Sequence, residues 1–96
     1  MGIITRRSLS YIRLAAYLAG QPPESRRLEM SLGDVAEVVG QPLPQSARFP
    51  SWWRNTPRRS HSRAWLTAGW EVAEISHDDD RVVFVRAPAP STIRLP

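Results

Sequence analysis

The chain has 96 residues, of which 42% are hydrophobic and 23% are charged, as is typical of one globular domain with a single core. The absence of cysteine excludes disulfides and thiolate-bound zinc. No apolar run approaches the roughly 20 residues of a membrane span. No apolar segment follows the early arginine pair, so a signal peptide is not expected either. We therefore expect a cytoplasmic protein that does not contact the membrane.

The N-terminal part predicts an arm followed by a helix. Residues 1–7 form the expected flexible arm, and Ser8 is the expected N-cap. The helix should end at about Ala19, because Gly20 and two prolines follow it. Its buried face is predicted from apolar residues at helical spacing, namely Tyr11, Leu14, Ala15 and Leu18.

A short strand and a second helix come next. Apolar and charged residues alternate over residues 26–30, which indicates a short edge strand. Ser31 and Asp34 have the spacing of a capping box and predict a helix over residues 32–39. Gly40 is placed to end that helix in the left-handed conformation.

Nineteen residues then separate Gly40 from Ser60, which is long for a structureless loop in a small domain. We expect short helical turns over residues 44–48 and 50–54, each opened by a proline. Ser60 is the expected N-cap of a helix over residues 61–68.

Gly69 ends that helix, and two β-rich runs follow it. The runs cover residues 70–76 and 81–86, and the turn between them reads His-Asp-Asp-Asp. They predict a β-hairpin. The remaining residues 87–96 form a proline-rich tail that we expect to be disordered.

Basic residues are concentrated in the middle of the chain. All thirteen are arginines, which reflects either a GC-rich genome or a preference for bidentate phosphate contacts. Residues 38–70 carry five arginines and no acidic residue, and all four tryptophans lie in the same part. A local positive charge of this kind suits an anionic partner.

The element order predicts the fold class α+β, with a winged-helix-like arrangement of helix, short strand, helix, helical insert, helix and β-hairpin. One such domain would cover residues 8–86. In winged helices the helix before the hairpin usually enters the major groove of DNA, and here that helix is 61–68. The long insert before it departs from the usual short turn.

The sequence also resembles a family of small uncharacterised bacterial domains. The resemblance covers roughly residues 9–86 and supports the domain limits, but it implies no activity. The residues that carry it are Tyr11, Leu14, Tyr17-Leu18, Leu43-Pro44, Ser46-Ala47-Arg48, Trp52-Trp53-x-Asn55, Ala64-Trp65-Leu66-x-Ala68-Gly69-Trp70 and Val82-Val83-Phe84-Val85-Arg86.

Candidate nucleic-acid-binding residues come from the basic segment, the expected recognition helix and the arm. They are Arg6, Arg7, Arg48, Trp53, Asn55, Arg54, Arg58, Arg59, His61, Arg63 and Thr67. The alternative for the arginines is a solvated basic face, and Arg48 could instead be a structural anchor.

The aromatic residues divide into core and surface candidates. Trp65 and Trp70 are expected in the core. Trp52 and Trp53 are adjacent, so we expect one to be buried and the other exposed, where it could stack on a base or contact a protein. Asn55 could read adenine, although capping a turn is the better interpretation.

Other chemistry has weak support. Three adjacent carboxylates, Asp78 to Asp80, would repel a DNA backbone and lack the spacing of a metal site. With only two histidines, no phosphate loop and no carboxylate pair in an apolar setting, we expect neither an enzyme nor a cofactor.

The leading hypothesis is therefore a small DNA-binding module that acts on double-stranded DNA as a monomer or homodimer. The alternative is a protein-interaction module or inhibitor that binds a larger machine through an exposed tryptophan surface and the acidic turn.

Overall fold

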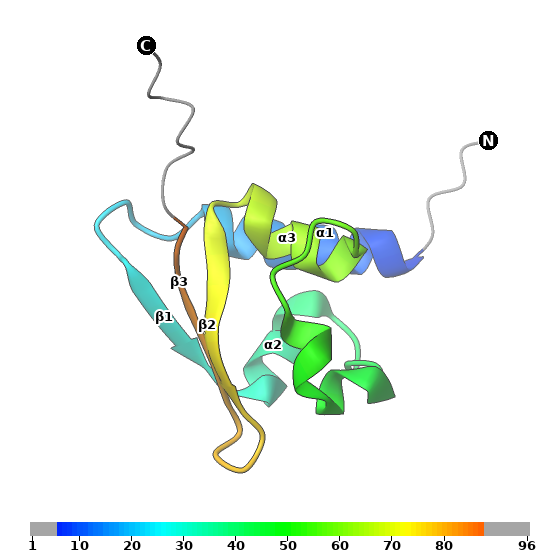
Figure 1. The fold of residues 1–96 in the computed structure, drawn as a ribbon. Coiled ribbons are helices and arrows are strands. Elements are labelled where there is room, and N and C mark those ends of the chain that lie inside the picture. Colours follow the sequence, from blue (N-terminus) through cyan, green and yellow to red (C-terminus); the bar gives the residue numbers. More distant parts are fainter. Residues whose placement is uncertain (1–5, 88–96) are drawn as a thin grey trace, which may run out of the picture.

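The computed structural model describes residues 6–87, and for residues 6–10 it describes the backbone alone. Within this range three α-helices and a three-stranded antiparallel sheet form a mixed α+β domain (Figure 1). In chain order the elements are α1 (Arg6–Ala19), β1 (Arg27–Met30), α2 (Leu32–Val39), the 3-10 helices η1 (Gln45–Arg48) and η2 (Pro50–Trp53), α3 (Ser60–Thr67), β2 (Trp70–Ser76) and β3 (Arg81–Arg86).

The sheet has the order β1-β3-β2, so β3 is the central strand. β1 pairs with β3 from Arg27 opposite Val85 to Met30 opposite Val82. A β-bulge interrupts the pairing of β2 with β3 after Val72. The helices lie on one side of the sheet (Figure 1). β3 is central because it carries the strongest run of β-branched and aromatic residues, and its Val82 and Phe84 are fully buried.

The opposite face of the sheet carries an ion-pair network. Arg81 lies 2.7 Å from Glu74 and 3.5 Å from Glu29, and Glu29 in turn lies 3.4 Å from Arg27. Val83 lies opposite both glutamates in the strand register and is 2% exposed. Exposed ion pairs of this kind add little to stability individually, but here their side chains flank a buried valine.

The prediction for α2 is confirmed in detail. The amide of Asp34 donates to Ser31 Oγ at 2.9 Å, and the Ser31 amide donates to the Asp34 carboxylate at 3.2 Å. The amide of Leu32 donates to Asp80 Oδ1 at 3.1 Å. Gly40 ends the helix with φ of 92°, a conformation that glycine adopts without steric cost. The N-terminus of α2 is therefore well capped.

Two predicted helix starts are wrong. α1 begins at Arg6, so Ser8 lies inside the helix, and the two arginines assigned to the arm belong to its first turn. Residues 1–5 of that arm lie outside the described range, as do residues 88–96 of the predicted tail. α3 begins at Ser60, and its N-cap is Arg59, whose side chain makes no capping hydrogen bond.

The predicted edge strand, the two helical turns of the insert and the hairpin are confirmed. No helix in the described part of the chain has the length and apolar character that a membrane crossing requires.

Candidate nucleic-acid interface

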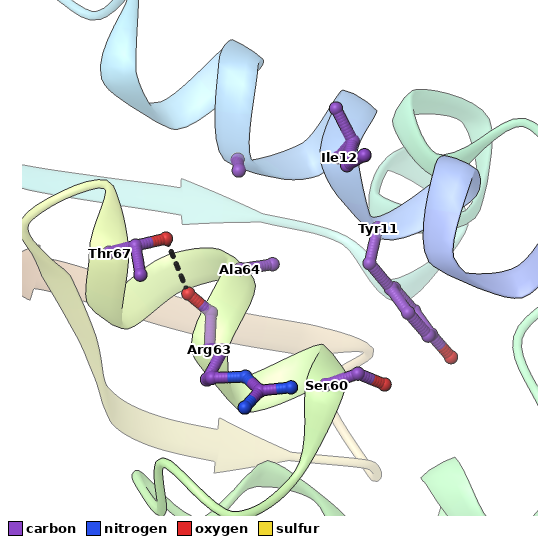
Figure 2. A pocket seen from close by; sticks show the side chains of 7 residues that line it. Tyr11, Ile12, Ser60, Arg63, Ala64 and Thr67 are labelled. Atoms are coloured by element: carbon purple, nitrogen blue, oxygen red, sulfur yellow. Dashed lines mark hydrogen bonds between the residues drawn. The ribbon is translucent and has the colours of Figure 1, made fainter. Parts of the chain in front are cut away.

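α3 divides its residues between the core and an open surface. His61, Ser62, Ala64 and Trp65 are buried, and α1 packs against the helix. Ser60, Arg63 and Thr67, spaced by three and four residues, share the exposed face. Thr67 Oγ1 donates to the Arg63 carbonyl at 2.6 Å, as Figure 2 shows. Two of the predicted contact residues, Arg63 and Thr67, are thus exposed on the helix that precedes the hairpin.

Trp52 and Trp53 of η2 are both buried, at 5% and 2% exposure. The expectation that Trp53 contacts nucleic acid is therefore wrong. Its ring stacks over Trp65 with centroids 6.0 Å apart, and its Nε1 donates to the Ala47 carbonyl at 2.8 Å. The two rings pack edge to face with centroids 4.7 Å apart, and both contact Trp65, so the tight turn of η2 buries the adjacent pair together. Trp65 and Trp70 are fully buried, as predicted.

His61 is the partner of Trp52 and not an exposed contact residue, which corrects a second expectation. The residue is 7% exposed, and its ring stacks on the Trp52 ring with centroids 3.9 Å apart and planes 2° apart. Its Nε2 lies 2.7 Å from the Trp52 carbonyl, which can only accept, so Nε2 carries the proton. Burial lowers the pKa of His61 below its ordinary value, and the positive charge of Arg59 lowers it further, against the opposing effect of the Trp52 hydrogen bond.

Asn55 is occupied by structural hydrogen bonds and does not present its amide to a base. Its Nδ2 donates to the Val72 carbonyl at 3.0 Å, and its Oδ1 accepts from the Val72 amide at 2.8 Å and from Trp65 Nε1 at 2.9 Å. The side chain thus pairs with the free edge of β2 as a strand would, next to the bulge. The two expectations for Asn55, that it reads adenine or that it caps a turn, are therefore wrong.

The arginines fall into two groups. The arginines of the sheet have partners within the domain. Arg81 and Arg27 form ion pairs. The Arg86 guanidinium lies 4.2 Å from the centre of the Trp70 ring and donates to the carbonyls of residues 21, 22 and 25. The other group is exposed and, in the part of the chain that the structure describes, forms no ion pair and no side-chain hydrogen bond. It includes the five arginines of the acid-free segment, Arg48, Arg54, Arg58, Arg59 and Arg63, and also Arg13 of α1 and Arg26.

Three adjoining hollows bring three of these five arginines together. The first, of about 250 Å³, lies between α1 and α3 and includes Arg63 (Figure 2). The second, of about 400 Å³, shares Tyr11 and Ser60 with the first and includes Arg59. The third, of about 420 Å³, shares Pro44 with the second and includes Arg48. No acidic residue lines any of the three. We call the five arginines and these hollows the arginine surface.

Arg54 and Arg58 lie in the segment that joins η2 to α3. Ser62 Oγ donates to the Arg54 carbonyl at 2.7 Å, which attaches this segment to the helix. Arg6 and Arg7 belong to the first turn of α1, and their side chains lie outside what the structure describes. Sequence reasoning missed Phe49, which follows Arg48 and is 60% exposed; its position in the acid-free segment was the available signal.

The acidic turn is held against the body of the domain. Asp80 caps α2 through Leu32, with φ of 53° at Asp80. His77 Nε2 donates to the Ala47 carbonyl at 2.8 Å, and the Asp79 carboxylate accepts from the Ser76 hydroxyl. Among the described residues no group of three histidine, cysteine or acidic side chains is arranged to hold a metal ion. The turn therefore has a structural role in packing the hairpin.

A family model matches residues 11–88, which is most of the chain. The chain belongs to the domain of unknown function family DUF7662. This match confirms the family resemblance and begins at Tyr11, close to the expected start of the domain. No curated protein and no solved structure matches the chain.

Proposed function

We propose that this domain binds nucleic acid, foremost double-stranded DNA, through the arginine surface. The observation that carries the proposal is that five exposed arginines without ion pairs occupy residues 38–70, a stretch that holds no acidic residue. Exposed guanidinium groups without acidic partners keep all of their donors for phosphate oxygens, which they bind in a bidentate manner. Arg59 and Arg63 lie at the start and on the exposed face of α3, Arg54 and Arg58 lie in the segment before it, and Arg48 lies in η1. None of the five has an ion-pair partner among the described residues.

The topology supports a winged-helix mode of binding. β1 follows α1 and pairs with β3, and the β2–β3 hairpin follows α3, an order that winged helices also have. α3 would then be the recognition helix, with Arg63 and Thr67 on its exposed face. The domain departs from the usual pattern in two places, since the insert with η1 and η2 replaces a short turn and the hairpin turn is acidic and tied to α2.

This departure changes which parts meet the duplex. An acidic hairpin tip would be repelled by the backbone, so the contacts would come from α3 and the insert. The domain then reads mainly the phosphate backbone, with α3 setting its orientation.

A protein partner is the second candidate. The tryptophan part of the surface expected for it is absent, because both members of the tryptophan pair are buried, whereas Asp78 to Asp80 of the acidic turn are exposed. Phe49, which is 60% exposed and follows Arg48, is the aromatic residue left for such a contact, since phenylalanine and arginine are both enriched at protein interfaces.

Fluorescence anisotropy with a labelled random-sequence duplex, measured over a salt series, tests the leading proposal. Three to five phosphate contacts predict a slope of log K against log salt of roughly −3 to −4.5. The double variant Arg59→Gln/Arg63→Gln should reduce the magnitude of that slope by about 2.

The matched control is Arg26→Gln/Arg27→Gln, which removes the same charge from exposed positions at and beside β1. It should leave the slope unchanged. Equal effects of the two variants would mean that only net charge matters, and this result would contradict the proposal.

A further inference from the structure

β1 leaves one edge of the sheet open. The strand order makes β1 and β2 the two outer strands. The edge of β2 is partly covered, because Asn55 forms two hydrogen bonds with the backbone of Val72. At the other edge, no other helix or strand of the described part lies beyond β1 (Figure 1). An open edge presents unpaired N–H and C=O groups that can accept a further strand.

The unpaired backbone groups at this edge belong to Arg27 and Glu29. The Arg86 amide donates to the Arg26 carbonyl at 3.1 Å, so these two residues are a hydrogen-bonded pair of the ladder. From this pair the register of β1 with β3 continues in single steps, without a bulge. Hydrogen-bonded and non-hydrogen-bonded pairs alternate in an antiparallel ladder. The N–H and C=O groups of residues 27 and 29 therefore point away from β3.

The residues that flank this part of β1 have their amides occupied. The Ser25 amide donates to the Pro22 carbonyl at 2.9 Å. The Ser31 amide donates to the Asp34 carboxylate at 3.2 Å. A strand that joins this edge would therefore find its free donors at residues 27 and 29.

A second copy of β1 is complementary to these free groups. In an antiparallel pairing about a twofold axis at Leu28, Arg27 of each copy lies opposite Glu29 of the other. All four hydrogen bonds then use the free groups, and both pairs unite opposite charges. An axis at Arg27 or at Glu29 would oppose like charges and would require the occupied amides of Ser25 or Ser31. The register with the axis at Leu28 is therefore favoured over its neighbours.

Both faces of the sheet would continue across this contact. Leu28 is half-buried on the helix side of β1, as is its buried neighbour Met30, and would pack against Leu28 of the other copy. On the open face Arg81 lies 3.5 Å from Glu29, so Arg27 of the other copy would extend the ion-pair network. Within one copy Arg27 has an exposed ion pair with Glu29 at 3.4 Å, which is a weak interaction that the new pair can replace.

We propose that two copies of this chain pair through β1 and join their three-stranded sheets into one continuous sheet. Charged residues often protect an edge strand, but a guard of one sign repels a second copy, whereas Arg27 and Glu29 attract it. The contact is isologous and small, so association should be weak and depend on concentration. It is independent of the proposed function, because the arginine surface involves α3 and the insert, and its test uses no nucleic acid.

Sedimentation equilibrium of the full chain, from micromolar to millimolar concentration, tests the pairing through charge reversal. Arg27→Glu opposes two glutamates in each pair, and Glu29→Arg opposes two arginines. Each variant alone should weaken the dimer by about tenfold or more. An equal mixture of the two restores an arginine opposite a glutamate in both pairs, and it should form a heterodimer about as tight as the wild-type dimer.

The matched control is Arg54→Glu, which makes the same charge change at an exposed position in the segment before α3. It should leave dimerisation unchanged. Hydrogen exchange followed by NMR then locates the contact. Raising the concentration should slow exchange of the amides of residues 27 and 29 in the wild type and in the mixture, but not in either charge-reversal variant alone.

Four results would overturn the proposal. The first is a wild-type chain that stays monomeric up to millimolar concentration, and the second is a mixture of the two variants that does not associate. The third is dimerisation that leaves exchange at residues 27 and 29 unchanged, which would place the contact elsewhere. The fourth is protection of these amides in a monomeric chain by an uncharged peptide of alternating valine and threonine, which would assign the edge to a foreign strand.

Discussion

Replacing Arg59 with serine should make the domain more stable and a weaker binder of nucleic acid at once. Arg59 is the N-cap of α3, with φ of −103° and ψ of 139°, and makes no capping hydrogen bond. A serine in this extended conformation can accept from the amides of the first turn, which the wild-type chain leaves uncapped. A cationic side chain is also unfavourable at a helix N-terminus.

The magnitude follows from these two effects. Arg59→Ala removes the repulsion between the arginine and the helix dipole, which is worth about 0.3–1 kcal/mol. Arg59→Ser gains the same and adds a cap worth about 1 kcal/mol relative to alanine. For a domain of this size each kcal/mol raises Tm by about 4–8 °C. The order of stability should be serine, then alanine, then wild type, while DNA affinity is highest for the wild type.

Urea denaturation followed by tryptophan fluorescence measures the stability of the three proteins, and anisotropy with the same duplex measures their affinity. A serine variant no more stable than the alanine variant would refute the open helix end. A serine variant that is more stable but binds DNA as tightly as the wild type would refute the proposed contact of Arg59 with the duplex.

Two other changes probe the residues that the structure removes from the interface. Asn55→Ala should lower the free energy of unfolding by about 2–3 kcal/mol, because it leaves Trp65 Nε1 without an acceptor and removes the hydrogen bonds to the edge of β2. Asn55→Asp keeps the acceptor oxygen, so its free energy of unfolding should fall less in the same urea titration. The pKa of His61 is lowered on folding, mainly by burial, so the unfolded chain binds the proton more readily. The free energy of unfolding should therefore fall as the pH drops below the ordinary value of 6.5 and level off below the pKa of His61 in the folded protein. Urea titrations across that pH range should show a shallower fall for His61→Gln than for the wild type. An equal fall in the two proteins would contradict the assignment of this pH dependence to His61.

Local signals were sufficient to predict most of the elements. The capping box of Ser31 and Asp34, the glycine stop at Gly40 and the valine-rich β3 depend on neighbouring residues, and all three are confirmed. The starts of α1 and α3 were less clear, because a serine near a helix start is equally acceptable inside the first turn. Ser60 occupies that first turn, so Arg59 became the cap.

The site was harder to predict because its decisive contacts are distant in sequence. Nothing local indicates that His61 stacks on Trp52 or that Asn55 pairs with Val72, seventeen positions away. The exposed arginines were identifiable from composition, since an acid-free segment offers them no nearby partner. The hollow at the N-terminus of α3 depends on the insert folding back beside the helix, which residue spacing does not encode.

Arginine footprinting tests the central claim most directly. The free protein and its complex with duplex DNA would be treated with phenylglyoxal, and the modification rate of each arginine would be read by mass spectrometry. The account predicts that DNA slows modification of Arg58, Arg59 and Arg63 and leaves Arg26 and Arg27 unchanged. Protection of the last two, or equal rates at all five positions with and without DNA, would contradict it.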